Sequence, residues 1–399
     1  MKILVTGAAG FIGKNLVAEL TARGHEVFSS TRDTSEIEFQ RFCQHAEFVY
    51  HLAGVNRSET ETDFVEGNTG STKRLVASLA AHANDAPIMF ASSIQATQDN
   101  PYGRSKLEAE NVLRRDHEQT VRTIHLFRFP NLFGKWGRPN YNSVVATFCY
   151  RAARDLPLEI HDPARPVQLA YIDDVLETLV NLLDTRGRTA AVYEEEVTVH
   201  PPIELGYIAD LLQTFKDSRQ NLTVPQLDDS FTKQLYSTYL SYLPVDRFAY
   251  DLKLNEDARG SFTEFIRTPD RGQVSINVAK PGITKGNHWH HTKNEKFLVV
   301  SGEALIRFRK VGENEVHTYH VTGEMMRVLD IPTGYTHNIE NIGTTDLVTV
   351  MWVNEAYDPN NPDTYFMEVQ DETTQSDDDR RDSSRNHTPV GRYSEARTR

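Results

Sequence analysis

The first 245 residues alternate between short apolar runs and segments whose apolar residues have helical spacing. The clearest apolar runs are ILVTG (3–7), EFVYHLAG (47–54), PIMFASS (87–93) and TIHLFRFPN (123–131). Between them, residues 14–23 and 71–82 carry apolar positions at helical intervals. Strands that alternate with helices form βαβ units, and these units build a parallel sheet. Residues 1–245 are therefore predicted to form a doubly wound α/β domain.

The pattern changes between residues 252 and 370. Short strands separated by glycine and proline turns follow one another at 274–280, 296–300, 304–310 and 317–323. Such a succession predicts an all-β sandwich or barrel, and we place the domain boundary within residues 243–260. The remaining segment, 371–399, has almost no apolar residues, so we expect a disordered tail. We favour a plain solvated extension over an interaction tail.

Composition narrows the class of protein. Two cysteines, Cys43 and Cys149, are too few for a disulfide framework and fit a reducing cytoplasm. The formal net charge of −13 argues against nucleic-acid binding, which needs concentrated positive charge. No apolar run is long enough to cross a membrane, and the N-terminus lacks the features of a signal peptide. We expect a cytoplasmic protein without membrane insertion.

A glycine-rich turn, TGAAGFIG (6–13), follows the first strand and opens a helix. In this position Gly7 permits a tight turn, Gly10 lets a pyrophosphate approach the backbone, and Gly13 allows close packing of helix on strand. The helix N-terminus offers free N–H groups to phosphate oxygens. The sequence therefore predicts a Rossmann-like dinucleotide site, with a purely structural glycine turn as the alternative.

The end of the second strand, 25–30, bears on the choice of dinucleotide. An acidic residue there favours NADH because it binds the adenosine ribose hydroxyls. This chain instead reads Ser29-Ser30-Thr31-Arg32-Asp33, and hydroxyls with a guanidinium suit a 2′-phosphate. We favour NADPH, while Asp33 leaves NADH open and Arg32 could be a plain surface charge.

Tyr102 and Lys106 lie downstream of the fourth predicted strand, 87–93, and are four residues apart, so they share one face of a helix. A lysine ammonium beside a phenol favours the phenolate, so we expect Lys106 to lower the pKa of Tyr102. Such a phenol can exchange a proton with a carbonyl and alcohol pair. Ser93, at the end of that strand, can hydrogen bond to the same carbonyl oxygen.

The first domain resembles the extended short-chain dehydrogenase/reductase family in TGAAGFIG, HLAG (51–54), Asn68, Ser93, YGRSK (102–106) and RFPNLFGKWG (128–137). The resemblance implies that Tyr102 is the catalytic acid, that Ser93 polarises the carbonyl and that Lys106 also binds the nicotinamide ribose. With Arg32, the implied cofactor-binding residues are Gly7, Gly10, Phe11, Ile12, Gly13, Leu52, Ala53, Gly54 and Lys106. The implied substrate-binding residues are Asn131 and Arg165, the latter in place of an arginine that the family often has near Val167.

The β region carries a candidate metal site. His288 and His290 face the same side of a strand, Glu295 lies in the next strand, and His337 follows a Pro-Thr-Gly turn. Such a nitrogen-rich set suits Zn²⁺, Fe²⁺, Ni²⁺ or Mn²⁺, and we favour zinc. The alternative is a polar barrel core without metal. His291 is predicted to face the opposite side.

The spacing of these four residues resembles both motifs of the cupin family, over about residues 270–355. The family's glycine six residues before Pro332 is replaced here by Met326, which we expect to change a turn and not the metal site. The predicted architecture is a dinucleotide-binding α/β domain (1–245), a cupin barrel (252–370) and a tail (371–399).

Together the two parts resemble bifunctional capsular polysaccharide synthesis enzymes over nearly residues 1–370. The resemblance implies that the cupin domain epimerises C3 of a UDP-2-acetamido-2,6-dideoxy-4-ketohexose. The reductase domain then reduces C4 with NADPH to UDP-2-acetamido-2,6-dideoxy-L-talose, toward UDP-N-acetyl-L-fucosamine. It also implies a homodimer.

Three matters stay open at this level. The base that removes the C3 proton is not identified by a motif, and Lys293, Tyr335 and an unligated histidine are candidates. The cupin domain could instead be structural, beside a simple nucleotide-sugar 4-ketoreductase. A redox sensor that binds NADPH without turnover is a third reading, disfavoured by the complete set of Ser93, Tyr102 and Lys106.

Overall fold

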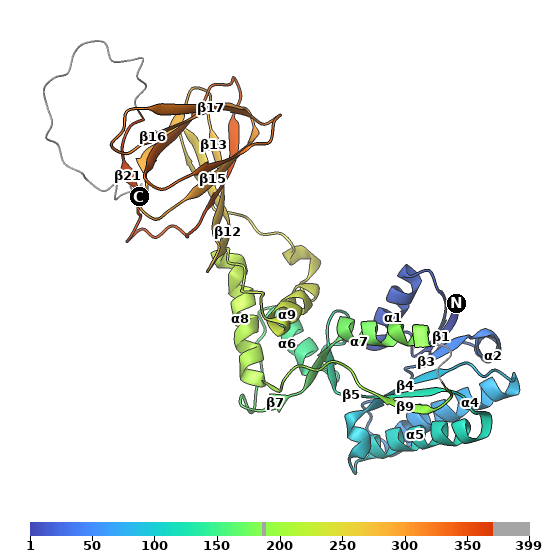
Figure 1. Cartoon of the computed structure of the whole chain (residues 1–399). Helices are drawn as coiled ribbons and strands as arrows, with labels where there is room; N and C mark the ends of the chain where they lie inside the picture. Colours follow the sequence, from blue (N-terminus) through green and yellow to red (C-terminus); the bar gives the residue numbers. More distant parts are fainter. Residues whose placement is uncertain (186–188, 370–399) are drawn as a thin grey trace, which may run out of the picture. The chain divides into compact units, whose positions relative to one another are not determined.

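The computed structural model describes residues 1–185 and 189–369 (Figure 1). The predicted tail, 371–399, lies outside the described residues. The chain forms two compact units. The first comprises Met1–Lys216 and Leu227–Phe248, and the second comprises Asp217–Gln226 and the described residues from Ala249 on. No helix within 1–185 or 189–369 has the length and hydropathy needed to cross a membrane.

A six-stranded parallel sheet organises the first unit. In spatial order its strands are β2 (Glu26–Ser30), β1 (Lys2–Thr6), β3 (Phe48–His51), β4 (Ile88–Ser93), β5 (Ile124–Phe129) and β9 (Val192–Glu195). The predicted parallel α/β fold is confirmed. β2 and β3, the next two strands along the chain, lie on opposite sides of β1, so the direction of strand order reverses at β1. A ligand crevice is therefore expected where β1 and β3 end.

Helices cover both faces of this sheet. One face carries α1 (Phe11–Ala22) and α7 (Ile172–Asn181), and the other carries α2 (Glu36–His45), α4 (Ser71–Ala81) and α5 (Pro101–Thr120). A separate cluster joins α6 (Val144–Ala152), α8 (Leu205–Asn221) and α9 (Ser230–Ser241), and the short helix α3 (Glu61–Phe64) follows β3 in the chain. The shorter helices are η1 (Val65–Gly70), η2 (Ile94–Thr97), η3 (Leu182–Thr185) and η4 (Val245–Arg247). Two small sheets pair β6 (Asn131–Phe133) with β8 (Leu169–Tyr171), and β7 (Pro166–Val167) with β10 (Ile203–Glu204).

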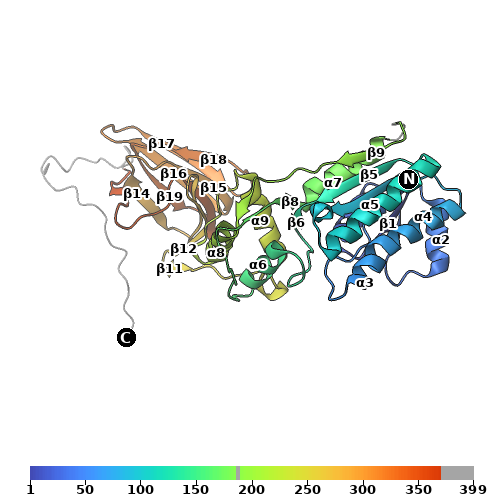
Figure 2. The ribbon, with the colours of Figure 1, turned by 90° about the horizontal axis from the view of Figure 1, so that it is seen from below.

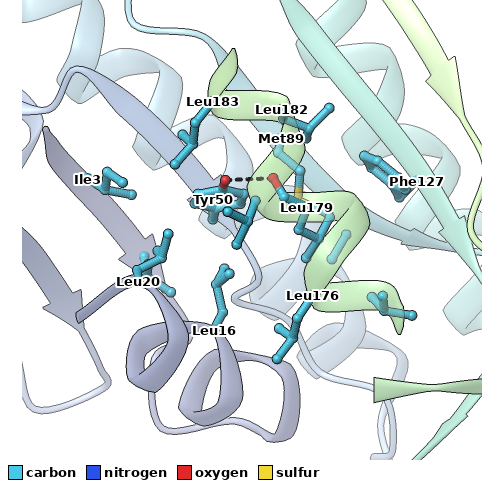
Figure 3. Close-up of a cluster of buried hydrophobic side chains, with 14 of the residues drawn as sticks. Ile3, Leu16, Leu20, Tyr50, Met89, Phe127, Leu176, Leu179, Leu182 and Leu183 are labelled. Atoms are coloured by element: carbon cyan, nitrogen blue, oxygen red, sulfur yellow. Dashed lines mark hydrogen bonds between the residues drawn. The ribbon is translucent and has the colours of Figure 1, made fainter. Parts of the chain in front are cut away.

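Burial on both faces explains the continuous apolar strands. Side chains of α1 and α7 pack on one face of the sheet with Ile3 and Tyr50 (Figure 3). There the Tyr50 hydroxyl donates to the backbone oxygen of Leu179 at 2.8 Å. Leu4, the next residue of β1, turns to the opposite face and packs with side chains of α2, α4 and α5.

The second unit consists of two antiparallel sheets (Figures 1 and 2). One contains β11 (Asn255–Asp257), β12 (Gly260–Thr268), β13 (Gly272–Ala279), β20 (Leu347–Val353), β15 (Glu295–Ser301) and β18 (Val328–Ile331). The other contains β17 (Val316–Thr322), β16 (Glu303–Lys310), β19 (Tyr335–Asn341), β14 (Thr284–Trp289) and β21 (Tyr365–Phe366). Buried Phe297, Ile306 and Ile339 join both sheets in one core, so the predicted all-β barrel is confirmed.

A short segment that precedes α9 also belongs to the second unit. The backbone N–H of Arg267 in β12 donates to Leu222 at 2.8 Å, and Val224 donates back to Arg267 at 2.9 Å. Residues 222–224 thus pair with β12 in a parallel arrangement at Thr223. The chain therefore contributes to the second unit at two separate places in the sequence.

The buried face of β13 is polar. Gln273, Ser275 and Asn277 are buried, whereas the alternate positions Val274 and Ile276 are only partly covered. In a strand, alternate residues face opposite sides, so this strand turns polar side chains inward and apolar ones outward. A wholly apolar barrel core would show the reverse pattern.

Candidate functional site

The glycine turn at the end of β1 has the geometry that close packing requires. Gly7 has φ of +69°, and a Cβ there would lie 2.7 Å from the backbone nitrogen of Ala53. A Cβ on Gly13 would lie 2.2 Å from the carbonyl oxygen of Gly7. Gly10 precedes α1 without a side-chain cap, so the first N–H groups of the helix stay free for an anion. Phe11 and Ile12 form the first turn of α1.

A buried histidine joins the ends of β1 and β3. His51 Nδ1 lies 2.7 Å from the Thr6 hydroxyl, and its Nε2 lies 3.0 Å from the Thr72 hydroxyl. Thr72 donates to the Asn68 carbonyl, so it accepts from Nε2–H and leaves Nδ1 to accept from Thr6. Burial, helped by the charge of Lys106, lowers the pKa of His51 to about 3. His51 is therefore a neutral residue that links Thr6 to Thr72 beside the glycine turn. The HLAG motif contains His51, but the motif alone does not indicate this role.

Arg32 lies two residues beyond the end of β2 and is exposed. The N–H of Ala8 in the glycine turn donates to the carbonyl of Ser30 at 3.1 Å, so β2 ends against this turn. Leu52, Ala53 and Gly54 follow β3 on the other side of it. The predicted cofactor residues of β1, β2 and β3 thus border one turn.

The structure brings Ser93 near Tyr102, close enough to oppose the shift in the pKa of the phenol. Ser93 ends β4, and the single-turn helix η2 follows it directly. Asn100 then caps α5 by accepting from the Gly103 N–H at 2.8 Å. A Cβ on Gly103 would lie 2.2 Å from the carbonyl oxygen of Gln95. This close approach of α5 to η2 lets a short connection bring Tyr102 back to Ser93.

Lys106 lies one turn further along α5 and is buried. Its Nζ donates to the carbonyl of Ala91 at 2.8 Å and stands 5.1 Å from the ring centroid of Phe90. Burial lowers the pKa of Lys106 to about 8, partly offset by the nearby carboxylate of Glu110. A Cβ on Gly54 would lie 3.0 Å from Nζ, so only glycine leaves this space open.

The expected lowering of the Tyr102 pKa is wrong for this structure. Burial raises the pKa of the phenol, and the nearby Ser93 opposes that shift only in part. One N–H of the Lys106 ammonium donates to the backbone carbonyl of Ala91, and its charge is not among the causes that shift the pKa of Tyr102. Tyr102 is therefore protonated at neutral pH, which is the state of a proton donor.

Sequence reasoning missed a buried carboxylate behind this pair. Glu110, four residues after Lys106 on α5, is fully buried. It accepts from the Ser92 hydroxyl at 2.5 Å and from Arg128 at 2.9 and 2.6 Å. The spacing to Lys106 was visible in the sequence, but nothing there pointed to Arg128 on β5.

A cavity of about 400 Å³ adjoins Glu110 and Arg128. It is also lined by Ile94, Leu126, Pro130, Gln168, Glu194, Glu195, Glu196, Val197 and Val199. Asn131, the exposed first residue of β6, follows one lining residue, and the exposed Arg165 precedes β7. Within residues 1–185 and 189–369, no hydrogen bond or ion pair joins Asn131 or Arg165 to Ser93 or Tyr102, so their binding roles stay predictions.

In the second unit the four predicted metal ligands converge. His288 (β14), His290, Glu295 (β15) and His337 (β19) each offer a ligand atom, all within 4.8 Å of one another. His288 pairs directly with His337 across the strands. Glu295 Oε2 lies 3.6 Å from His290 Nε2 and 3.1 Å from His337 Nε2.

This cluster fits a divalent cation. His290 Nε2 and Glu295 Oε2 are buried polar atoms that lack a hydrogen-bond partner, which native interiors rarely tolerate. Burial lowers the pKa of His288 to about 3, so its imidazole is neutral and can donate a lone pair. Burial raises the pKa of Glu295, but the neighbouring imidazoles of His290 and His337 outweigh this and lower it overall.

The neighbouring candidates fall outside the ligand set. The ring of His291 lies 4.5 Å from that of Trp289, away from the cluster, as strand alternation predicts. Lys293 is buried and its Nζ donates to the carbonyl of Pro362 at 2.6 Å. Tyr335 begins β19 and is half-buried. Met326 is 65% exposed.

Each of the two units matches a known protein family. Residues 3–194 match the NAD dependent epimerase/dehydratase family, and residues 255–365 match the polysaccharide biosynthesis C-terminal domain. The chain is 42% identical to the UDP-2-acetamido-2,6-beta-L-arabino-hexul-4-ose reductase of Pseudomonas aeruginosa, over 92% of this chain and 99% of that protein. The crystal structure of the capsular polysaccharide assembling protein CapF from Staphylococcus aureus shares 52% identity and a TM-score of 0.86, covering 92% of this chain and all of CapF.

The chain belongs to the CapF family. It is therefore an enzyme of the reductase and epimerase type, and its family implies a nicotinamide cofactor. A UDP-glucuronic acid 4-epimerase from Bacillus cereus matches 61% of this chain at 20% identity with a TM-score of 0.51, which shows a shared fold only. The CapF family assignment rests on both units together, because the Pseudomonas aeruginosa reductase and the Staphylococcus aureus CapF structure each match 92% of this chain.

Proposed function

We propose that this CapF-family enzyme converts a UDP-2-acetamido-2,6-dideoxy-4-ketohexose in two steps, C3 epimerisation in the β unit and NADPH-dependent C4 reduction in the α/β unit. The product would be UDP-2-acetamido-2,6-dideoxy-L-talose, a precursor for UDP-N-acetyl-L-fucosamine and capsular polysaccharide. The observation that supports the proposal is that one chain holds Ser93 near Tyr102 in the unit with the glycine turn, and a cluster of four possible metal ligands in the other unit.

In the reduction, Tyr102 supplies the proton. NADPH, when bound at the glycine turn, supplies the hydride to C4. The C4 oxygen gains negative charge as the hydride arrives, and the protonated phenol of Tyr102 donates its proton to that oxygen. Ser93, which lies near Tyr102, donates to the same oxygen and holds it in place. Lys106 does not lower the pKa of the resting phenol, so its ammonium is proposed to act after the transfer, when it favours the phenolate that remains.

In the epimerisation, the C4 ketone makes the C3 proton acidic. His288, His290, Glu295 and His337 would hold a divalent cation, favoured as zinc. Such an ion supplies Lewis-acid polarisation of a carbonyl oxygen. A base of the β unit removes the C3 proton, and return of a proton to the opposite face inverts the centre. Reduction of C4 then ends the acidity of C3 and fixes the new configuration.

Of the candidates for the base that removes the C3 proton, we favour Tyr335. The amine of Lys293 is held by the Pro362 carbonyl, and His291, the unligated histidine next to His290, packs on Trp289. Tyr335 stands two residues before His337 on β19. Because the contacts above engage Lys293 and His291, the hydroxyl of Tyr335 is our candidate for the base.

Deuterium exchange tests the proposal directly. The ketosugar is incubated with the enzyme in D₂O without NADPH, and C3 deuteration is followed by NMR. We expect exchange with the wild-type chain and its loss in His290→Ala together with bound metal; His291→Ala, which alters a neighbouring imidazole outside the cluster, is the matched control. Absence of exchange in the wild-type chain would instead favour the 4-ketoreductase with a structural cupin domain.

The preference for NADPH has its own test. Arg32 is exposed beside the dinucleotide turn and is proposed to pair with the 2′-phosphate. Arg32→Ala should raise the KM for NADPH about tenfold or more and leave that for NADH within about twofold, because only NADPH carries this phosphate. Equal changes in the KM values for NADPH and NADH would show that Arg32 does not bind the 2′-phosphate.

A further inference from the structure

A segment near the end of the described chain passes beside the metal-ligand cluster of the β unit. Its strand β21 pairs with β14, placing Phe366 opposite His288 and Tyr365 opposite Trp289. Asp363, two residues before Tyr365, is only 9% exposed. It has φ of +38°, a left-handed backbone conformation that aspartate tolerates better than most residues.

The side chain of Asp363 holds the loop between β14 and β15. One carboxylate oxygen accepts from the N–H of His291 at 3.0 Å. The other accepts from the N–H groups of Thr292 at 2.8 Å and Lys293 at 3.0 Å, and from the Thr292 hydroxyl at 2.9 Å. This loop connects His290 to Glu295, so the carboxylate fixes the stretch of chain between two predicted ligands.

The backbone of Asp363 contacts a predicted ligand directly. Its carbonyl oxygen lies 2.6 Å from His290 Nδ1. A carbonyl can only accept, so Nδ1 carries the proton and the lone pair of the imidazole is on Nε2. Nε2 is the buried atom that lacks a partner, and it lies 3.6 Å from Glu295 Oε2.

We propose that Asp363 is a positioning residue for the metal centre, which fixes the tautomer and ring orientation of His290 through its carbonyl and holds the His291–Lys293 loop through its carboxylate. The proposal rests on the proposed metal site. Partners of this kind strengthen metal binding because they prevent a ligand from rotating away, and their loss typically weakens metal affinity about 10–100-fold.

The variant Asp363→Asn tests this with little change in volume. An amide oxygen replaces one carboxylate oxygen, while the amide nitrogen brings hydrogens toward N–H donors. The probe is Zn²⁺ alone, titrated into the metal-free full-length chain against a chromophoric chelator. The control is Asp358→Asn, in the same segment, where the carboxylate of Asp358 accepts from the N–H of Asn360 at 2.8 Å and from no other group of the described chain.

We expect Asp363→Asn to bind Zn²⁺ at least about tenfold more weakly and Asp358→Asn within about twofold of wild type. The visible spectrum of the Co²⁺-loaded variant should also change, because the loop between His290 and Glu295 loses the carboxylate that fixes it and the two ligands are positioned less firmly. Wild-type zinc affinity and an unchanged Co²⁺ spectrum in Asp363→Asn would overturn the proposal. A lower melting temperature of the metal-free chain with unchanged zinc affinity would also overturn it, because it shows a merely structural role.

A milder variant covers a failure of Asp363→Asn to fold. Thr292→Val removes the hydroxyl bond to Asp363 at 2.9 Å and a longer, exposed contact with Glu355 at 3.3 Å, and about threefold weaker zinc binding is expected. Wild-type affinity in this variant would then count against the proposal. If the wild-type chain binds no Zn²⁺, the proposed metal site itself is wrong, whereas equal binding by wild type and both variants rejects only the role of Asp363.

Discussion

Single side chains in the reductase site owe their protonation states to burial. Tyr102 keeps its proton because burial raises the pKa of the phenol. Lys106 is close to losing its proton at mildly alkaline pH because burial lowers its pKa to about 8. The two shifts leave a phenol that can donate a proton beside an ammonium whose charge is conditional on pH. We expect this pair to support the proposed C4 reduction only while Tyr102 and Lys106 are both protonated.

The pH dependence of the reduction follows from Lys106. The ammonium is present below about pH 8 and is lost as the pH rises through that value, so kcat/KM for the ketosugar should fall on the alkaline side near pH 8. Tyr102 does not produce this fall, because its pKa is raised. Steady-state rates at saturating NADPH between pH 6 and 10 provide the measurement. A flat profile through pH 9.5 would show that the charge of Lys106 is not required.

His51 makes the stability of the first unit sensitive to acid. Its pKa is about 3 in the folded chain, against about 6.5 in an unfolded one. Between these values the unfolded chain binds a proton that the folded chain does not. The free energy of unfolding therefore falls as the pH drops below about 6.5, by up to about 1.4 kcal/mol per pH unit.

The variant His51→Gln removes this titration. We expect its stability to decline less steeply than that of wild type between about pH 6 and pH 4. Urea denaturation at several pH values gives the two slopes. Parallel slopes would mean that His51 is protonated in the folded chain.

At the scale of elements, α5 carries most of the reductase chemistry. It begins at a cap on Asn100, presents Tyr102 and Lys106 within its first two turns, and buries Glu110 against β4 and β5. The order of these residues is set by the helical repeat. The contacts that make them useful come from η2 and the sheet.

Glu110→Gln should destabilise the first unit by about 2–3 kcal/mol. The change leaves the guanidinium of Arg128 without its charged partner, but Arg128 is 34% exposed, so the cost stays below that of a fully buried pair. Glu108→Gln on the same helix is the control. Glu108 pairs with Arg115 at the surface, and its loss should cost less than about 1 kcal/mol. Similar urea midpoints for both variants would contradict this account.

Local patterns predicted much of both units, and contacts distant in sequence account for what was missed. Strands such as β1 and β4 were readable because buried parallel strands form continuous apolar runs. The ligand set from His288 to His337 was readable because strand alternation and a turn place it. Asp363 was beyond reach, since its carbonyl meets His290 across 73 positions of sequence. The pKa of Tyr102 was mistaken because burial depends on the complete tertiary structure.

For the whole molecule, the proposal assigns two reactions to two units. Tyr102→Phe should lower the reduction rate about 100-fold or more, since the proton donor is lost. Deuterium exchange at C3 should continue at the wild-type rate, because the metal ligands belong to the other unit. NADPH oxidation and NMR measure the two activities in the same preparation. Loss of exchange in Tyr102→Phe would mean that one site performs both steps.

The predicted homodimer also belongs to this scale. Phe262 and Phe265 on β12 are 36% and 45% exposed, and the outward positions of the neighbouring β13 are apolar. Exposed apolar surface of this kind favours association. Light scattering after size-exclusion chromatography should give a mass of twice 45.4 kDa. A mass of 45.4 kDa at micromolar concentration would leave this apolar surface without a partner.

The pairing of residues 222–224 with β12 limits how such a gene can be rearranged. Ten residues of the barrel's own unit, Asp217–Gln226, are encoded upstream of α9, inside the stretch that otherwise builds the reductase. A single recombination junction placed after α9 would deliver a barrel without the stretch that donates to and accepts from Arg267. A barrel transferred to another chain would therefore need Asp217–Gln226 as well as the residues after α9 to keep this pairing.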